Sequence, residues 1–171
     1  IIERSNEKKS HFPQELKRYN QYSQFLKNKF AAKVYKVTID AGFGCPNRDG
    51  SLSEGGCIFC DDSGSFSQAH SNKLGITEQL ETGIERLSKR FKAEKFISYF
   101  QAFSNTYADA EHLKKVYDSA LGHKDVVGLS IGTRPDCVDE EKLDLIADYA
   151  KDYYTWVEYG LQSIHDKTLK Y

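Results

Sequence analysis

The chain has 171 residues, a net charge of −1 and 39% hydrophobic residues, a composition typical of one soluble globular domain. No apolar run approaches the roughly 20 residues of a membrane-spanning helix, and the polar start does not resemble a secretion signal. Composition therefore argues against a membrane or secreted protein, and we expect a cytoplasmic one.

Charge is distributed unevenly along the chain. Residues 1–36 carry nine Lys or Arg against three Asp or Glu, whereas the other 135 residues carry 15 against 22. We therefore separate a basic N-terminal helical leader, residues 1–33, from a core, residues 34–171. The lysines and tyrosines of the leader would suit the phosphates and bases of a nucleic acid. The alternative, which we favour, is an amphipathic helix that packs on the core through Leu16, Tyr19, Phe25 and Leu26.

Strand and helix signals alternate along the core. Apolar residues recur at helical spacing in three segments, with Thr77 and Asp139 as expected N-caps. We predict strands at 34–40, 95–103, 126–131 and 154–161, and helices at 77–91, 109–121 and 139–150. Strands that alternate with helices of this length are typical of βαβ units and a parallel sheet, so the predicted fold class is α/β.

The loops that follow the strands should meet. Right-handed crossovers place every strand-to-helix loop at the carboxyl end of a parallel sheet, where ligands bind in such folds. We therefore expect one site built from four separate segments. These are the loop 42–67 and the segments 101–106, 132–136 and 160–163.

Three cysteines lie in the first of these loops, at Cys45, Cys57 and Cys60. Thiolates are soft ligands that suit zinc or an iron–sulfur cluster, and three of them leave one metal position open for chemistry. Cys137 would instead complete a closed, structural zinc site. Disulfide pairing is a further alternative, but four cysteines without a regular framework are typical of an intracellular metal-binding protein.

Four phrases carry a resemblance to a known family: DAGFGCPNRDG at 40–50, YFQAFSNTY at 99–107, GTRPD at 132–136 and VEYGLQS at 157–163. Over residues 14–171 the chain resembles the radical S-adenosylmethionine superfamily. These sequence motifs most resemble those of its elongator-like branch and, within that branch, those of the YtqA/YhcC (MnmL-type) proteins. The superfamily's usual spacing is C-x3-C-x2-C, whereas this chain has C-x11-C-x2-C, a lengthened form that related branches also resemble.

The resemblance implies a partial (β/α) barrel of the radical SAM type, with parallel strands and outer helices. We expect this barrel to be truncated before its last strands, because the chain contains no methionine and stops where a helix begins. The implied cofactors are a [4Fe–4S] cluster on Cys45, Cys57 and Cys60 and S-adenosyl-L-methionine bound at the open iron. Reductive cleavage would give a 5′-deoxyadenosyl radical, with flavodoxin or ferredoxin as an electron donor.

The resemblance also implies contacts to S-adenosylmethionine. Phe59 matches an aromatic position that lies along the adenine, with an ordinary core phenylalanine as the alternative. The superfamily's glycine-rich motif, which holds the methionine amino group, corresponds to the segment with Gln101, Ser104 and Asn105. Gln162 matches a ribose-contacting glutamine of coproporphyrinogen-oxidase-like relatives.

Ribose recognition is expected to differ in one respect. Those relatives carry a glutamate where this chain has Gly132, so Glu158, Arg134 or Ser130 would replace it. Alternation along a strand points Glu158 and Gln162 the same way, inward. A buried carboxylate without a partner is costly, so we expect Glu158 to contact the cofactor or Arg134. A purely structural Arg134–Glu158 pair is the alternative.

The branch resemblance implies modification of the wobble uridine of tRNA, converting 5-carboxymethylaminomethyluridine into 5-aminomethyluridine. In this hypothesis the radical abstracts hydrogen from the glycine-derived methylene, and the leader helps to hold the RNA. Two alternatives remain open. One is radical chemistry on a small molecule or protein, and the other is a non-catalytic, zinc-stabilised interaction module.

Overall fold

One parallel sheet organises the molecule. The computed structural model describes residues 19–64 and 74–170, so the predictions for Leu16 and for loop residues 65–67 lie outside the described residues. The strands are β1 (Val34–Ile39), β2 (Lys95–Phe100), β3 (Val126–Thr133) and β4 (Tyr154–Tyr159). They pair in the order β1-β2-β3-β4, each parallel to its neighbour. The predicted α/β class with a parallel sheet is confirmed.

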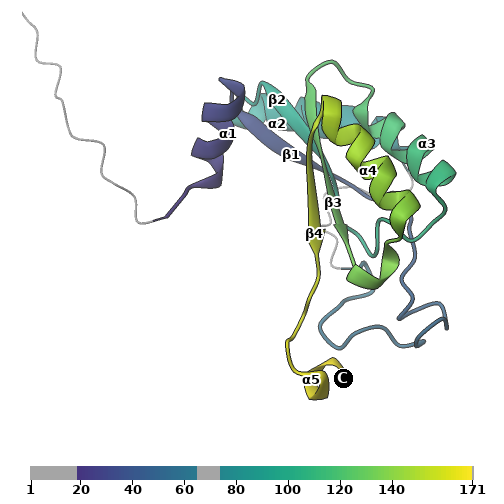
Figure 1. Ribbon diagram of the computed structural model, residues 1–171. Coiled ribbons are helices and arrows are strands. Elements are labelled where there is room, and N and C mark those ends of the chain that lie inside the picture. Colours follow the sequence, from purple (N-terminus) through teal and green to yellow (C-terminus); the bar gives the residue numbers. More distant parts are fainter. Residues whose placement is uncertain (1–18, 65–73, 171) are drawn as a thin grey trace, which may run out of the picture.

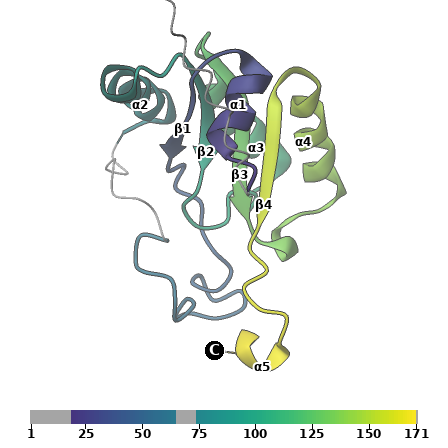
Figure 2. The same cartoon turned by 90° about the vertical axis from the view of Figure 1, so that its left-hand side faces the viewer.

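Helices lie on both faces of the sheet. They are α1 (Tyr22–Phe30), α2 (Ile76–Phe91), α3 (Ala110–Leu121), α4 (Glu140–Asp152) and α5 (Asp166–Leu169), with a 3-10 turn at Pro135–Cys137. α3 and α4 lie on the face opposite α1, and α2 lies beside β1 (Figure 1, Figure 2). Within the described ranges, no helix combines the length and the apolar character that crossing a bilayer requires.

The main core fills the space between the sheet and helices α2, α3 and α4. Phe100 of β2 and Tyr117 of α3 are both 0% exposed and pack ring against ring. Gly83 lets α2 approach β1 closely, since a Cβ there would lie 2.4 Å from Val37 Cγ1. Each large apolar side chain buried here stabilises the fold by about 1.5–3 kcal/mol. The apolar residues of each helix recur about every 3.6 positions and so form one face, which packs on the sheet. In the sheet, successive side chains point to opposite faces.

Helix α1 covers the amino half of the other face, which we call the inner face. Leu26 is 2% exposed and forms a second cluster with Val34 and Ile97, against which Phe25 also packs. The interpretation of α1 as a helix that packs on the core is confirmed for Phe25 and Leu26. It is wrong for Tyr19, which is 69% exposed.

Three strand ends lie two or more residues from their predicted places. β2 ends at Phe100 rather than at residue 103, because Phe103 has a left-handed backbone (φ 58°) that a strand cannot contain. β4 ends at Tyr159, and β3 runs on to Thr133, which pairs with Tyr159. The predicted cap Asp139 is confirmed, since its carboxylate accepts from the Lys142 amide. Thr77 is not a cap, because α2 already begins at Ile76, after Gly75.

Candidate functional site

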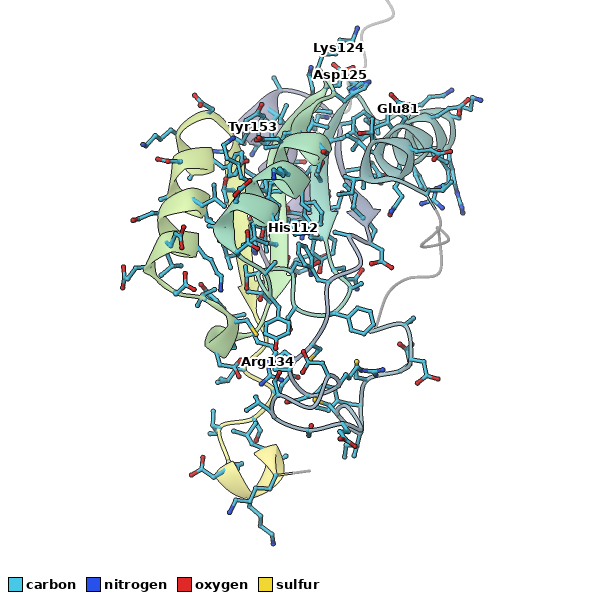
Figure 3. All side chains as sticks on the ribbon, turned by 90° about the vertical axis from the view of Figure 1, so that its right-hand side faces the viewer. Glu81, His112, Lys124, Asp125, Arg134 and Tyr153 are labelled. Carbon is cyan, nitrogen blue, oxygen red and sulfur yellow. The ribbon has the colours of Figure 1, made fainter. Side chains whose placement is uncertain are left out.

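The loops at the carboxyl ends of the strands are hydrogen-bonded to one another, as predicted. The amide of Ser104, after β2, donates to the carbonyl of Gly44, after β1 (3.2 Å). The Asn105 amide donates to the carbonyl of Gly132 (3.2 Å). The Gly160 amide, after β4, donates to the carbonyl of Thr133 (3.0 Å). We call this edge the rim; Figure 3 places Arg134 here, at the opposite end of the molecule from Asp125.

Turns and one arginine shape the cysteine loop. The Arg48 amide donates to the carbonyl of Cys45 (2.8 Å), and the Cys60 amide donates to the carbonyl of Cys57 (3.0 Å), which closes a turn across each end of the loop. The Arg48 guanidinium then donates to the Cys60 carbonyl (3.2 Å) and so ties the two turns together. Gly56 has a positive φ of 73° and leaves only 3.0 Å between a built Cβ and Arg48 Nε. Glycine is therefore required at this position.

The three loop thiols form no disulfide and are half-buried. Asn47 Nδ2 lies 3.0 Å from Cys57 Sγ and donates to it. Among the described residues, no three His, Cys, Asp or Glu side chains are grouped closely enough to form a metal-ligand set. The structure thus brings Cys45, Cys57 and Cys60 into one loop but not into ligand spacing. Their metal-binding role stays a prediction.

Cys137 lies in the 3-10 turn that follows β3 and is 5% exposed. Burial raises the pKa of its thiol, and the neighbouring Asp136 carboxylate raises it further. Cys45 is close enough to contribute in the same direction. A buried thiol held neutral in this way is a poor metal ligand unless the metal displaces its proton.

The segment after β2 contains the most enclosed polar atoms of the rim. Ser104 is 1% exposed and Asn105 is 0% exposed. Asn105 Nδ2 donates to the Gly132 carbonyl (2.8 Å), and the Asn105 carbonyl accepts from the Tyr117 hydroxyl (2.6 Å). Within the described residues, Asn105 Oδ1 has no hydrogen-bond partner, and Ser104 Oγ has none apart from the neighbouring Cys137 thiol. Buried polar atoms are rarely left so, and such a pair at a rim is typical of a place where a polar ligand binds. Gln101, also predicted here, is half-buried.

Phe59 and Gln162 lie at the surface. Phe59 is 60% exposed, so its interpretation as an ordinary core residue is wrong. Gln162 is exposed and has a left-handed backbone, with φ 63°. Its side chain turns back toward Gly160, where a built Cβ would lie 2.5 Å from Gln162 Nε2. The prediction that Gln162 continues the alternation of Glu158 is wrong, because that alternation ends with β4 at Tyr159.

The expected contact between Arg134 and Glu158 is absent. Arg134 donates from Nε and Nη2 to both carboxylate oxygens of Asp136, at 2.9 and 2.7 Å. This bidentate pair raises the pKa of the arginine above its usual value. Glu158 instead lies on the inner face of β4, where Lys36 is its cationic partner (2.6 Å). Arg134 lies beyond the end of β3, and from there its side chain reaches Asp136, two residues later in the chain.

Glu158 belongs to a polar row that crosses all four strands. We call Lys36, Tyr99, Ser130 and Glu158 the inner row. Glu158 accepts from Lys36 Nζ (2.6 Å), Tyr99 OH (2.9 Å) and, more weakly, Ser130 Oγ (3.4 Å). Burial alone would raise the pKa of Glu158, but the Lys36 and Tyr99 hydrogen bonds outweigh it and hold that pKa below its usual value. Burial, together with the bond to Glu158, raises the pKa of Tyr99 to about 12.

Sequence reasoning named Ser130 and Glu158 but missed the other two members of the row. A signal was present: Lys36 is a lone charge inside a β-branched strand, and Tyr99 follows the alternation of the second strand. Only the strand order could pair them with Glu158.

Comparison with known proteins gives uncharacterised relatives. No protein-family model matches the chain. It is 43% identical over 152 residues to the uncharacterised protein YtqA of Bacillus subtilis, a match that covers 89% of the chain and 47% of YtqA. Identity is 44% over 156 residues to the uncharacterised protein MJ0486 of Methanocaldococcus jannaschii, covering 89% and 47%. It is 40% over 151 residues to YhcC of Escherichia coli, covering 88% and 48%.

The chain therefore spans about half the length of the curated relatives it matches. The predicted resemblance to the YtqA and YhcC proteins is confirmed. The names of these relatives state no activity.

Proposed function

We propose that the chain forms the core of a radical S-adenosylmethionine enzyme, a partial (β/α) barrel in which Cys45, Cys57 and Cys60 hold a [4Fe–4S] cluster. The observation that carries this proposal is the rim. Loops after four successive parallel strands meet at one edge, joined by hydrogen bonds to one another or to the end of β3, and the first of them holds three half-buried thiols that form no disulfide. Ligands bind at this edge in parallel α/β folds.

The donor set suits the group by its chemistry. Three thiolates in one loop match an iron–sulfur cluster with one open iron. Because the thiols do not form a ligand set among the described residues, binding would require the loop to draw them together. When bound, such a cluster supplies the electron that cleaves S-adenosylmethionine to a 5′-deoxyadenosyl radical.

Residues of this chain would bind and orient the cofactor. Asn105 Oδ1 is buried without a partner among the described residues, and Ser104 Oγ is buried in the same segment. Both would accept hydrogen bonds from the methionine ammonium, with Gln101 in the same segment. Phe59 would lose exposed apolar surface by covering the adenine. Arg134 and Gln162, both at the rim, are the ribose contacts we propose.

The substrate we propose is tRNA with 5-carboxymethylaminomethyluridine at the wobble position, and the product we propose is 5-aminomethyluridine. A flavodoxin or ferredoxin would supply the electron. Lys27, Lys29 and Lys33, on and just after α1, give the chain a cationic surface for the RNA backbone.

The first test is anaerobic reconstitution of the full-length protein with iron and sulfide, read by absorption near 400 nm and by electron paramagnetic resonance. We expect a brown protein whose reduced signal changes when S-adenosylmethionine is added. Cys57→Ala should abolish the signal, whereas the matched variant Cys137→Ser should keep it. A colourless protein that holds zinc and needs Cys137 would establish an interaction module instead.

The substrate needs its own test. Deleting the gene should make 5-carboxymethylaminomethyluridine accumulate in cellular tRNA at the expense of 5-aminomethyluridine, as measured by nucleoside mass spectrometry. Unchanged tRNA beside an intact cluster would direct the radical chemistry to a small molecule or a protein.

A further inference from the structure

The ion pair at the centre of the inner row is only partly buried. The side chains of Lys36 and Glu158 are 25% and 37% exposed, and their charged atoms lie 2.6 Å apart. Both face the side of the sheet that α1 covers only over its amino half. The pair is therefore open to a ligand, and its parts come from β1 and β4, the two outer strands of the sheet.

Each member of the pair is held in place by groups other than its partner. Tyr99 OH and Ser130 Oγ bind the Glu158 carboxylate at 2.9 and 3.4 Å. The Lys36 ammonium lies 4.1 Å from the centroid of the Tyr99 ring, and the rings of Tyr22 and Trp156 lie at 5.8 and 6.0 Å. Aromatic faces attract a cation without neutralising it. If the pair opens, each charge therefore keeps some of its contacts.

We propose that Lys36 and Glu158 bind a substrate group that carries an amine and a carboxylate close together, as an N-substituted glycine does. The Lys36 ammonium would take the carboxylate, and Glu158 would take the protonated amine. This inference rests on the proposed function, because the 5-carboxymethylaminomethyl group is such a zwitterion. It assigns recognition of that group to this pair.

Charge balance explains why a zwitterion fits here. Removing one partner from a part-buried ion pair leaves a charge that is neither paired nor fully solvated, which is costly. A ligand with both charges replaces each partner at once, so nothing is left unpaired. A ligand with only the amine or only the carboxylate pairs with one of the two residues and leaves the charge of the other unpaired. The same pair therefore accepts the zwitterion and rejects its singly charged analogues.

The place of the pair agrees with this role. Lys36 precedes the end of β1 at Ile39 by three residues, which is about 10 Å along a strand. Glu158 is paired in register with Gly132, whose carbonyl accepts from Asn105 at the rim. A group bound here lies on the inner face of the sheet, near the rim.

The test uses reconstituted full-length protein and synthetic anticodon stem-loops that differ only at the wobble uridine. One carries the carboxymethylaminomethyl group, one an aminomethyl group (amine only) and one a carboxymethyl group (carboxylate only). Competition binding to the native protein should favour the first by about tenfold, equivalent to about 1.4 kcal/mol. Equal affinity for all three would overturn the proposal.

Two variants give opposite shifts that a structural role would not produce. Glu158→Gln keeps the shape of the side chain and should make the carboxylate-only stem-loop the preferred one. Lys36→Gln should make the amine-only stem-loop preferred. Lys95→Gln is the matched control, because Lys95 forms a pair of similar exposure with Asp125 (2.8 Å) at the opposite end of the sheet. It should leave the tenfold preference unchanged.

One further outcome would count against the proposal. If either variant weakens S-adenosylmethionine binding as much as stem-loop binding, the pair belongs to the cofactor site. If Lys36→Gln fails to fold, Glu158→Gln alone still decides, by whether its preference reverses.

Failure of the function is separable from failure of the site. Unchanged cellular tRNA after gene deletion, with stem-loop discrimination intact, would refute the function and leave the site standing. Accumulated substrate nucleoside without discrimination would refute the site alone.

Discussion

The hydroxyl of Tyr117 links α3 to the rim. It is fully buried and donates to the Asn105 carbonyl at 2.6 Å, in the segment whose amide and side chain also bind Gly132. Tyr117→Phe keeps the ring contact with Phe100 but removes the hydrogen bond. A net hydrogen bond contributes about 1 kcal/mol, and an unsatisfied buried carbonyl adds at least as much, so we expect a loss of about 2 kcal/mol.

Urea unfolding of the full-length protein, followed by far-ultraviolet circular dichroism, measures this loss. Tyr149→Phe is the matched control: its ring touches that of Tyr117, but its hydroxyl donates to Asp118 at the surface, where water can replace it. That variant should lose less than about 1 kcal/mol. Hydrogen exchange should also speed up at the Asn105 amide in Tyr117→Phe alone. Equal losses in the two variants, or unchanged exchange, would refute the reasoning.

Three further predictions concern stability. Gly128→Ala should cost about 2–3 kcal/mol, since its Cβ would lie 2.5 Å from the Tyr154 carbonyl oxygen of the paired strand, whereas Gly122→Ala, which meets nothing closer than 3.8 Å, should be nearly neutral in the same urea assay. Asp139→Ala removes the cap of α4 and should lower the unfolding free energy by about 1 kcal/mol, a loss that calorimetry would detect. The lowered pKa of Glu158 stabilises the fold above the ordinary value of 4.5, and this contribution is lost as pH falls through the folded-state pKa. The stability difference between the native protein and Glu158→Gln should therefore shrink from pH 6 to pH 3, and a constant difference would contradict the assignment.

The sequence was sufficient for whatever depends on local periodicity. Helical spacing located α2, α3 and α4, and the alternation of strands with helices predicted a parallel sheet. It also predicted that the loops with Cys45, Ser104 and Gly160 would meet, because that follows from chain handedness alone.

Long-range partners were beyond local reasoning. Lys36 and Glu158 are 122 positions apart, and only their places in β1 and β4 bring them together. The turn at Gln162 was missed because alternation holds only while the strand is paired, and nothing local marks Tyr159 as the last paired residue. Thr77 has the chemistry of a cap, but α2 begins before it, after Gly75.

The strand order has a consequence for how the protein is made. Every strand pairs only with its neighbours along the chain, in the order β1-β2-β3-β4. Each strand therefore needs only the strand before it to be in place, although the first pairing joins Val34 to Lys95 across a long segment, and parallel pairing of this kind is slow. On the ribosome, each βα unit can dock on the one before it as soon as it emerges. The newest strand then presents one unpaired edge, which the next strand covers, while no described strand covers the outer edge of β1.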